Sequence, residues 1–77
     1  MAKQFFVRAE WDDEAGVWYV AETNLPGLAV EGDTLEEFTG NVREAAIDLV
    51  ELNAHLIGAD GPYPIDITAH QEMKICA

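Results

Sequence analysis

The stretch Asn-Leu-Pro-Gly-Leu-Ala-Val-Glu-Gly-Asp-Thr-Leu-Glu-Glu, residues 24–37, decides the fold of this chain. Pro26 and Gly27 suit the two central positions of a type II turn, because proline presets φ and glycine adopts the left-handed conformation of the second position. Residues 28–31 then predict a short strand. Thr34 predicts a helix N-cap, because Glu37 completes a capping box three residues later. The stretch therefore predicts, in order, a tight turn, a strand and the start of a helix.

The helix predicted after Thr34 has one apolar stripe, because its apolar residues recur at spacings of three and four. The members of the stripe are Leu35, Phe38, Val42, Ala45, Leu49, Leu52 and Leu56. Gly58 is expected to end the helix. A stripe of this length needs a sheet to pack against, and strand patterns flank the helix on both sides in the sequence.

Three further strands are predicted from the alternation of apolar and polar residues. The first, residues 4–11, has two faces, with Phe5, Val7, Ala9 and Trp11 on one and Phe6, Arg8 and Glu10 on the other. An acidic turn ending at Gly16 leads to the second strand, residues 17–22, because glycine supplies the positive φ of such loops. The last strand follows Pro64 and alternates as far as Ile75.

These elements predict one domain, residues 1–77, with a two-layer α+β fold in the order β-β-β-α-β. Right-handed crossover through the helix places the last strand beside the first, so we expect a mostly antiparallel four-stranded sheet in the order 3-2-1-4. One helix covers one face. The other face is expected to expose apolar residues chosen from Phe6, Trp18 and Val20, or from their alternates, and to meet another chain.

The net charge and the length of the chain limit the classes of function that we expect. Fifteen acidic residues against four basic ones leave a net charge of −11, which disfavours nucleic-acid binding and favours a basic protein partner, although acidity can also serve solubility alone. A chain below roughly 80 residues has a small core, so self-association is expected to stabilise it. The single cysteine, Cys76, and the lack of a leader or of a run of ~18 apolar residues indicate a cytoplasmic protein outside the membrane.

The predicted helix also has an acidic face that we expect to bind the partner. Its carboxylates are Glu36, Glu37, Glu44, Asp48 and Glu51. Ile47 falls among these acids, opposite the apolar stripe, where it predicts a small apolar contact inside the acidic face.

The chain resembles the HicB-like family of bacterial antitoxins. The residues that carry the resemblance are Trp11-Asp12-Asp13-Glu14, Val17-Trp18-Tyr19-Val20, Leu25-Pro26-Gly27-Leu28 and Gly32-Asp33-Thr34-Leu35-Glu36-Glu37. The resemblance implies a truncated, inactive relative of the RNase H fold that masks a small basic toxin, HicA, which cleaves mRNA. Two-domain HicB proteins add a C-terminal DNA-binding module, and 77 residues leave no room for one, so the likeness is to short stand-alone relatives.

Two other functions are considered. One is a structural or regulatory homo-oligomer that binds a small ligand between subunits. The other is a metal-dependent nuclease, whose carboxylate candidates are Glu10, Glu36 or Glu44, and Asp66. His55 and His70 each stand alone in the sequence. We therefore predict a non-enzymatic protein with no catalytic residues, no metal and no cofactor.

Overall fold

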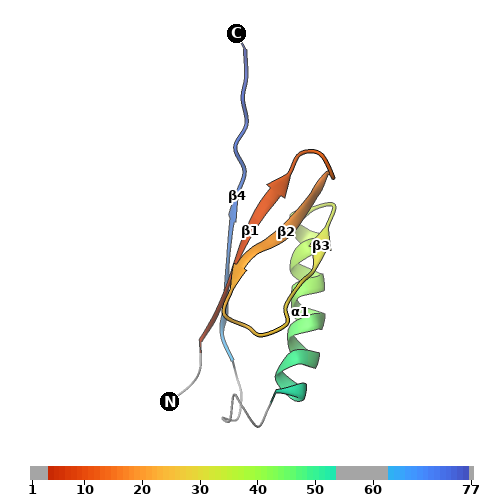
Figure 1. Cartoon of the computed structure of the whole chain (residues 1–77), viewed down its shortest axis with the longest axis vertical. Helices are drawn as coiled ribbons and strands as arrows, with labels where there is room; N and C mark the ends of the chain where they lie inside the picture. Colours follow the sequence, from red (N-terminus) through yellow and green to blue (C-terminus); the bar gives the residue numbers. More distant parts are fainter. Residues whose placement is uncertain (1–3, 54–62, 77) are drawn as a thin grey trace.

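A four-stranded sheet and one helix form two layers in the computed structural model, which describes residues 4–53 and 63–76 (Figure 1). The elements are β1 (Phe5–Asp12), β2 (Val17–Thr23), β3 (Glu31–Gly32), α1 (Leu35–Leu52) and β4 (Ile65–His70). The sheet order is β3-β2-β1-β4, as predicted. β1 is antiparallel to β2 and parallel to β4, and β2 is antiparallel to β3. The fold is therefore the α+β arrangement that the sequence predicts.

The turns and the helix start follow their local sequence. Gly16 and Gly27 have positive φ values of 69° and 83°. The Leu28 amide donates to the Leu25 carbonyl over 3.3 Å, which closes the predicted turn around Pro26. Thr34 Oγ1 accepts a hydrogen bond of 3.0 Å from the Glu37 amide and so caps α1.

β3 is shorter than predicted. The sequence predicted a strand over residues 28–31, but only Glu31 and Gly32 pair with β2. Leu28 instead packs into the core after the turn, so the chain reaches the sheet edge only at Glu31.

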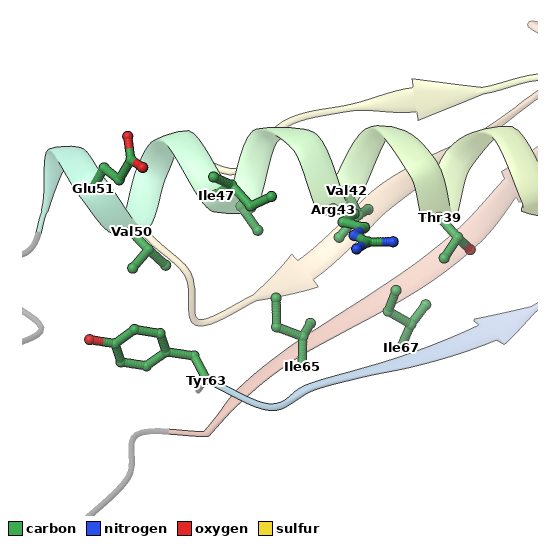
Figure 2. A pocket seen from close by; sticks show the side chains of 10 residues that line it. Thr39, Val42, Arg43, Ile47, Val50, Glu51, Tyr63, Ile65 and Ile67 are labelled. Atoms are coloured by element: carbon green, nitrogen blue, oxygen red, sulfur yellow. The ribbon is translucent and has the colours of Figure 1, made fainter. Parts of the chain in front are cut away.

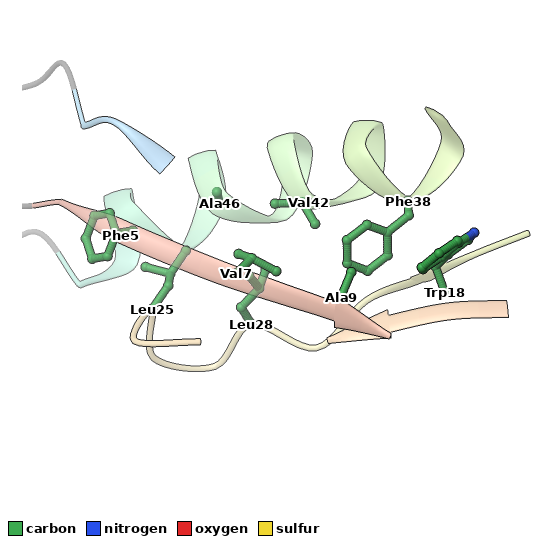
Figure 3. Packing of buried hydrophobic residues seen from close by; sticks show 9 residues of the cluster. All are labelled: Phe5, Val7, Ala9, Trp18, Leu25, Leu28, Phe38, Val42 and Ala46. Atoms are coloured by element: carbon green, nitrogen blue, oxygen red, sulfur yellow. The ribbon is translucent and has the colours of Figure 1, made fainter. Parts of the chain in front are cut away.

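The core lies between α1 and the face of the sheet beneath it (Figure 3). It consists of Phe5, Val7, Ala9, Trp18, Leu25, Leu28, Phe38, Val42 and Ala46. The predicted core face of the first strand is thus confirmed for its first three members.

The buried stripe of α1 differs from the predicted one. Its fully buried members are Phe38, Val42 and Ala46, of which Ala46 was not predicted. Leu35 and Leu52 are exposed, the latter to 73%, because they are the first and last residues of the helix and project past the core. The predicted Leu56 and the helix end at Gly58 lie outside the described residues.

The prediction that Phe6, Trp18 and Val20 share an open sheet face is wrong. Trp18 lies opposite Trp11 and Val20 opposite Ala9, so both side chains belong to the face that α1 covers, and Trp18 is only 8% exposed. Phe6 alone of the three is on the open face. The cause is the hairpin register, which aligns Trp18 with the odd-numbered residues of β1.

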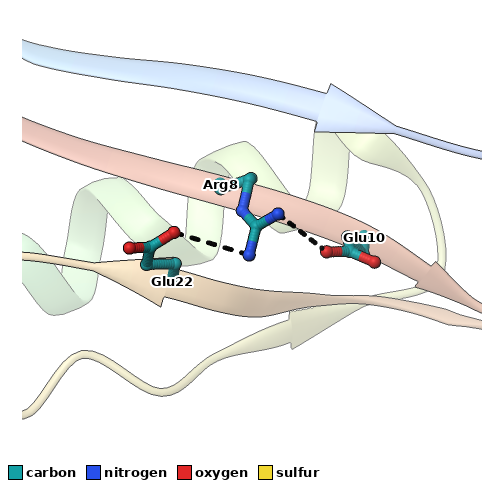
Figure 4. Close-up of polar contacts among 3 residues, drawn as sticks. All are labelled: Arg8, Glu10 and Glu22. Carbon is teal, nitrogen blue, oxygen red and sulfur yellow. Dashed lines mark ion pairs between the residues drawn. The ribbon is translucent and has the colours of Figure 1, made fainter.

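The open face is mixed: Phe6 lies on it together with Val17 and Tyr19, which pair with Asp12 and Glu10, and it also carries charged side chains. Arg8 lies between Glu10 and Glu22, with N–O distances of 3.3 and 3.4 Å (Figure 4). All three side chains are partly exposed, so these ion pairs contribute little to stability.

Candidate protein-binding surfaces

The outer surface of α1 is acidic. The five carboxylates predicted to bind a partner, Glu36, Glu37, Glu44, Asp48 and Glu51, are all on this helix and all exposed. The ion pairs within residues 4–53 and 63–76 both use Arg8, so none of the five has a cation within 4.0 Å in this part of the chain. Among the described residues, α1 therefore presents to solvent five carboxylates that form no ion pair.

Ile47 is 54% exposed on α1, beside the acidic side chains among which the helical wheel predicts it. It also lines the rim of a groove together with Val50 and Glu51 (Figure 2). Ile47 lies about 140° round the helix from Val42, the centre of the buried stripe, so only the outer rim of the groove reaches it. It joins the acidic surface to an apolar one.

The groove between α1 and β4 has a volume of about 480 Å³ (Figure 2). It is lined by Thr39, Val42, Arg43, Ala46, Ile47, Val50, Glu51, Tyr63, Ile65 and Ile67. It exists because α1 packs over β3, β2 and the buried face of β1, which leaves the helix-side face of β4 only partly covered. The sequence did contain a signal for it, since the last strand places two isoleucines on one face and a single helix must cover four strands.

The carboxylates considered for a nuclease site are not brought together. Glu10 and Asp66 lie on the open face of the sheet, whereas Glu36 and Glu44 lie on the helix layer. Glu10 contacts Arg8, and Asp66 accepts a hydrogen bond of 2.8 Å from Gln4 Nε2. In the described part of the chain no three His, Cys, Asp or Glu side chains are placed to hold a metal ion.

The remaining polar candidates have no common site. His70 is exposed at the end of β4 and Cys76 is exposed near the C-terminus, while His55 lies outside the described residues. Across residues 4–53 and 63–76, no helix has the length and apolar character needed to cross a membrane.

Both a known family and a solved structure match this chain. A family model described as a domain of unknown function, DUF1902, matches residues 4–77. The chain belongs to the DUF1902 family. This DUF1902 domain is also similar to the crystal structure of hypothetical protein TTHA1013 from the extremely thermophilic bacterium Thermus thermophilus. The two are 32% identical with a TM-score of 0.76, over 95% of the DUF1902 domain and 100% of that chain.

A comparison of the DUF1902 domain with curated proteins gave no match. The solved relative supports the α+β arrangement over nearly the whole length of both chains. Neither the family description nor the name of the solved relative includes an activity, so the surfaces of the DUF1902 domain are what bear on its function.

Proposed function

We propose that this DUF1902 domain is a non-enzymatic, cytoplasmic protein-binding module of HicB-like antitoxin type that masks a small basic toxin. The observation that carries the proposal is the exposed row of five carboxylates on α1 with no described cation within 4.0 Å. The turn and cap residues that resemble HicB-like proteins add to it, because they occupy the predicted turn and helix start.

The mechanism is occlusion by charge complementarity. A ribonuclease binds RNA phosphates through lysine and arginine side chains. Carboxylates at Glu44, Asp48 and Glu51 would pair with those cations and exclude the RNA. The charge of −11 would also speed the encounter with a basic partner and make it sensitive to salt. Ile47 supplies an apolar contact beside these charges.

The test combines capture with charge reversal. The tagged domain is used to capture partners from a lysate of its native host, bound proteins are eluted with rising salt, and a captured small basic protein is purified and assayed for RNA cleavage. The variant Glu44→Lys/Asp48→Lys/Glu51→Lys is expected to lose binding and to leave RNA cleavage uninhibited. A matched control, Asp13→Lys/Glu14→Lys/Glu31→Lys, has the same net charge but leaves α1 unchanged, so it should retain binding. Equal loss of binding in both variants would show that only net charge matters, and unaffected binding in the helix variant would refute the proposed surface.

The groove favours a second candidate function, a homo-oligomer that binds a small apolar ligand. Its volume of about 480 Å³ lies within the usual range of small-molecule sites, roughly 300–1,000 Å³. An apolar dye displaced by a ligand library would test it. The replacement Val50→Glu, which places a charge in the groove, should abolish dye binding, whereas Asp48→Ala on the outer surface should not.

A further inference from the structure

The two edges of the sheet differ in length and in what covers them. β3 is only two residues long, and its Glu31 carbonyl accepts a hydrogen bond of 2.7 Å from Asn41 Nδ2 on α1. β4 is six residues long and pairs with β1 along one side only. No hydrogen bond covers its outer edge within the described residues. An uncovered edge of this length is a template for pairing with another strand.

After β4 the chain continues in the direction of that strand. Residues 71–76 run away from the sheet in the direction of β4 (Figure 1). Met73 and Ile75 are 72% and 83% exposed. No proline or glycine interrupts residues 65–76, although proline is a common device for protecting an edge strand.

The alternation of β4 also continues into this extension. The helix-side positions are Ile65, Ile67, Ala69, Gln71, Met73 and Ile75, and the intervening positions are Asp66, Thr68, His70, Glu72 and Lys74. Ile65 and Ile67 point into the groove beneath α1 (Figure 2). Residues 65–75 therefore have the pattern of one long strand, of which β1 pairs with only the first half.

We infer that two copies of this chain pair antiparallel through residues 65–75, with His70 of each copy on the two-fold axis. Ile65 then lies opposite the partner's Ile75, and Ile67 lies opposite the partner's Met73. On the other face, Asp66 lies opposite the partner's Lys74. The apolar side chains that are exposed in one chain thus meet apolar neighbours, and the acid meets the cation.

Charge and burial select this register over its neighbours. A shift of one residue would set the helix-side face against the open face. A shift of two in one direction would place Asp66 opposite the partner's Glu72, and like charges directly opposite are destabilising. A shift of two in the other direction would move Ile75 away from the partner's Ile65 and Lys74 away from the partner's Asp66.

The pairing surface is separate from the acidic surface of α1, so this inference does not rest on the proposed function. Residues 65–75 carry two acids and one lysine, whereas the outer surface of α1 carries five acids. Two chains of charge −11 therefore repel each other less when they meet along residues 65–75 than when their α1 surfaces meet.

The first test is the oligomeric state of the full chain by sedimentation equilibrium. The wild-type chain is expected at twice its mass of 8.5 kDa. Met73→Pro removes a ladder donor at a position that is 72% exposed and lies beyond the end of β4, so the variant should be a folded monomer by circular dichroism. A monomeric wild type at all concentrations, or a dimeric Met73→Pro variant, would overturn the inference.

Charge exchange tests the register. Lys74→Glu places an acid opposite the partner's Asp66, and the two-fold axis repeats this pair once more in the dimer. The dissociation constant of the dimer should therefore rise about tenfold. Asp66→Lys combined with Lys74→Glu restores the complementarity and should recover the affinity of the wild type. Failure of the double variant to recover it would contradict this register.

Cross-linking gives an independent readout in a Cys76→Ser background. His70→Cys places two thiols opposite each other on the axis and should form a disulfide-linked dimer under mild oxidation. Thr68→Cys, two residues away, faces the partner's Glu72 and should stay unlinked. Efficient linkage through position 68 but not through position 70 would refute the pairing.

Discussion

Replacing Gly32 with alanine tests how closely the helix packs on β3. A Cβ atom at Gly32 would lie 2.4 Å from Phe38 N, 2.6 Å from Phe38 Cα and 3.0 Å from the carbonyl carbon of Glu37. All three are backbone atoms of α1, so no side-chain rotation can relieve the contacts. Gly32 is buried and pairs with Trp18, which prevents β3 from moving aside freely.

The size of the effect follows from these distances. The shortest contact must lengthen by about 1 Å to reach ordinary van der Waals distance, and this separates Phe38 from the core residues beneath it. Overpacking that side chains can partly absorb costs about 1–3 kcal/mol, and contacts with backbone belong at the upper end of that range. We expect a loss of about 3 kcal/mol, which is most of the ~3–5 kcal/mol available to a domain of this size. The melting temperature should fall by about 15 °C or more.

The assay is urea denaturation followed by tryptophan fluorescence and circular dichroism. Both proteins are compared at one concentration, because self-association makes stability concentration-dependent. Gly40→Ala is the matched control, since a Cβ at this exposed helical position meets nothing within 4 Å. Alanine favours the helix over glycine, so this control should gain about 0.5–1 kcal/mol. Equal midpoints for the two variants would refute the argument from close approach.

Three further measurements test the packing and polar contacts. Thr34→Ala removes the helix cap and should lower the free energy of unfolding, measured by thermal unfolding, by about 1 kcal/mol. Thr34→Ser keeps a hydroxyl at the cap and should retain most of that stability. Arg8→Ala should cost less than about 1 kcal/mol, and the difference should disappear in ~1 M salt because its ion pairs are exposed; a large, salt-independent loss would contradict this. Phe38→Ala should cost about 3–5 kcal/mol in urea unfolding. Leu52→Ala should stay within about 0.5 kcal/mol, because Leu52 lies outside the core.

Local sequence signals were sufficient where the structure depends on a few neighbouring residues. The turn at Pro26 and Gly27 needs only one fixed φ and one positive φ, and both can be read from residue type. The helix start needs only the hydroxyl of Thr34 three residues before the Glu37 amide. The strand order also followed from a general rule of crossover handedness.

Features that depend on distant residues were not predictable in the same way. The face on which Trp18 lies depends on its pairing with Trp11 across the hairpin, and a different loop geometry would have reversed it. The burial of Ala46 depends on where α1 settles on the sheet, which the helical period alone does not specify. The groove between α1 and β4 depends on the pairing of the strands and on the position of α1 on the sheet.

The widths of the elements explain why this chain leaves one side of its sheet uncovered. A helix is about 10 Å across and strands are about 4.8 Å apart, so a single helix covers roughly two strands. α1 lies over the inner strands and β3, and the helix-side face of β4, at the sheet edge, is left beside the groove. If two copies pair along β4, both helices stand on the same side of one continuous sheet. Their acidic outer surfaces then remain free, and a dimer offers two such surfaces to a basic partner. Loss of pairing should therefore reduce avidity for a partner with two binding sites, while one-to-one binding to α1 is retained.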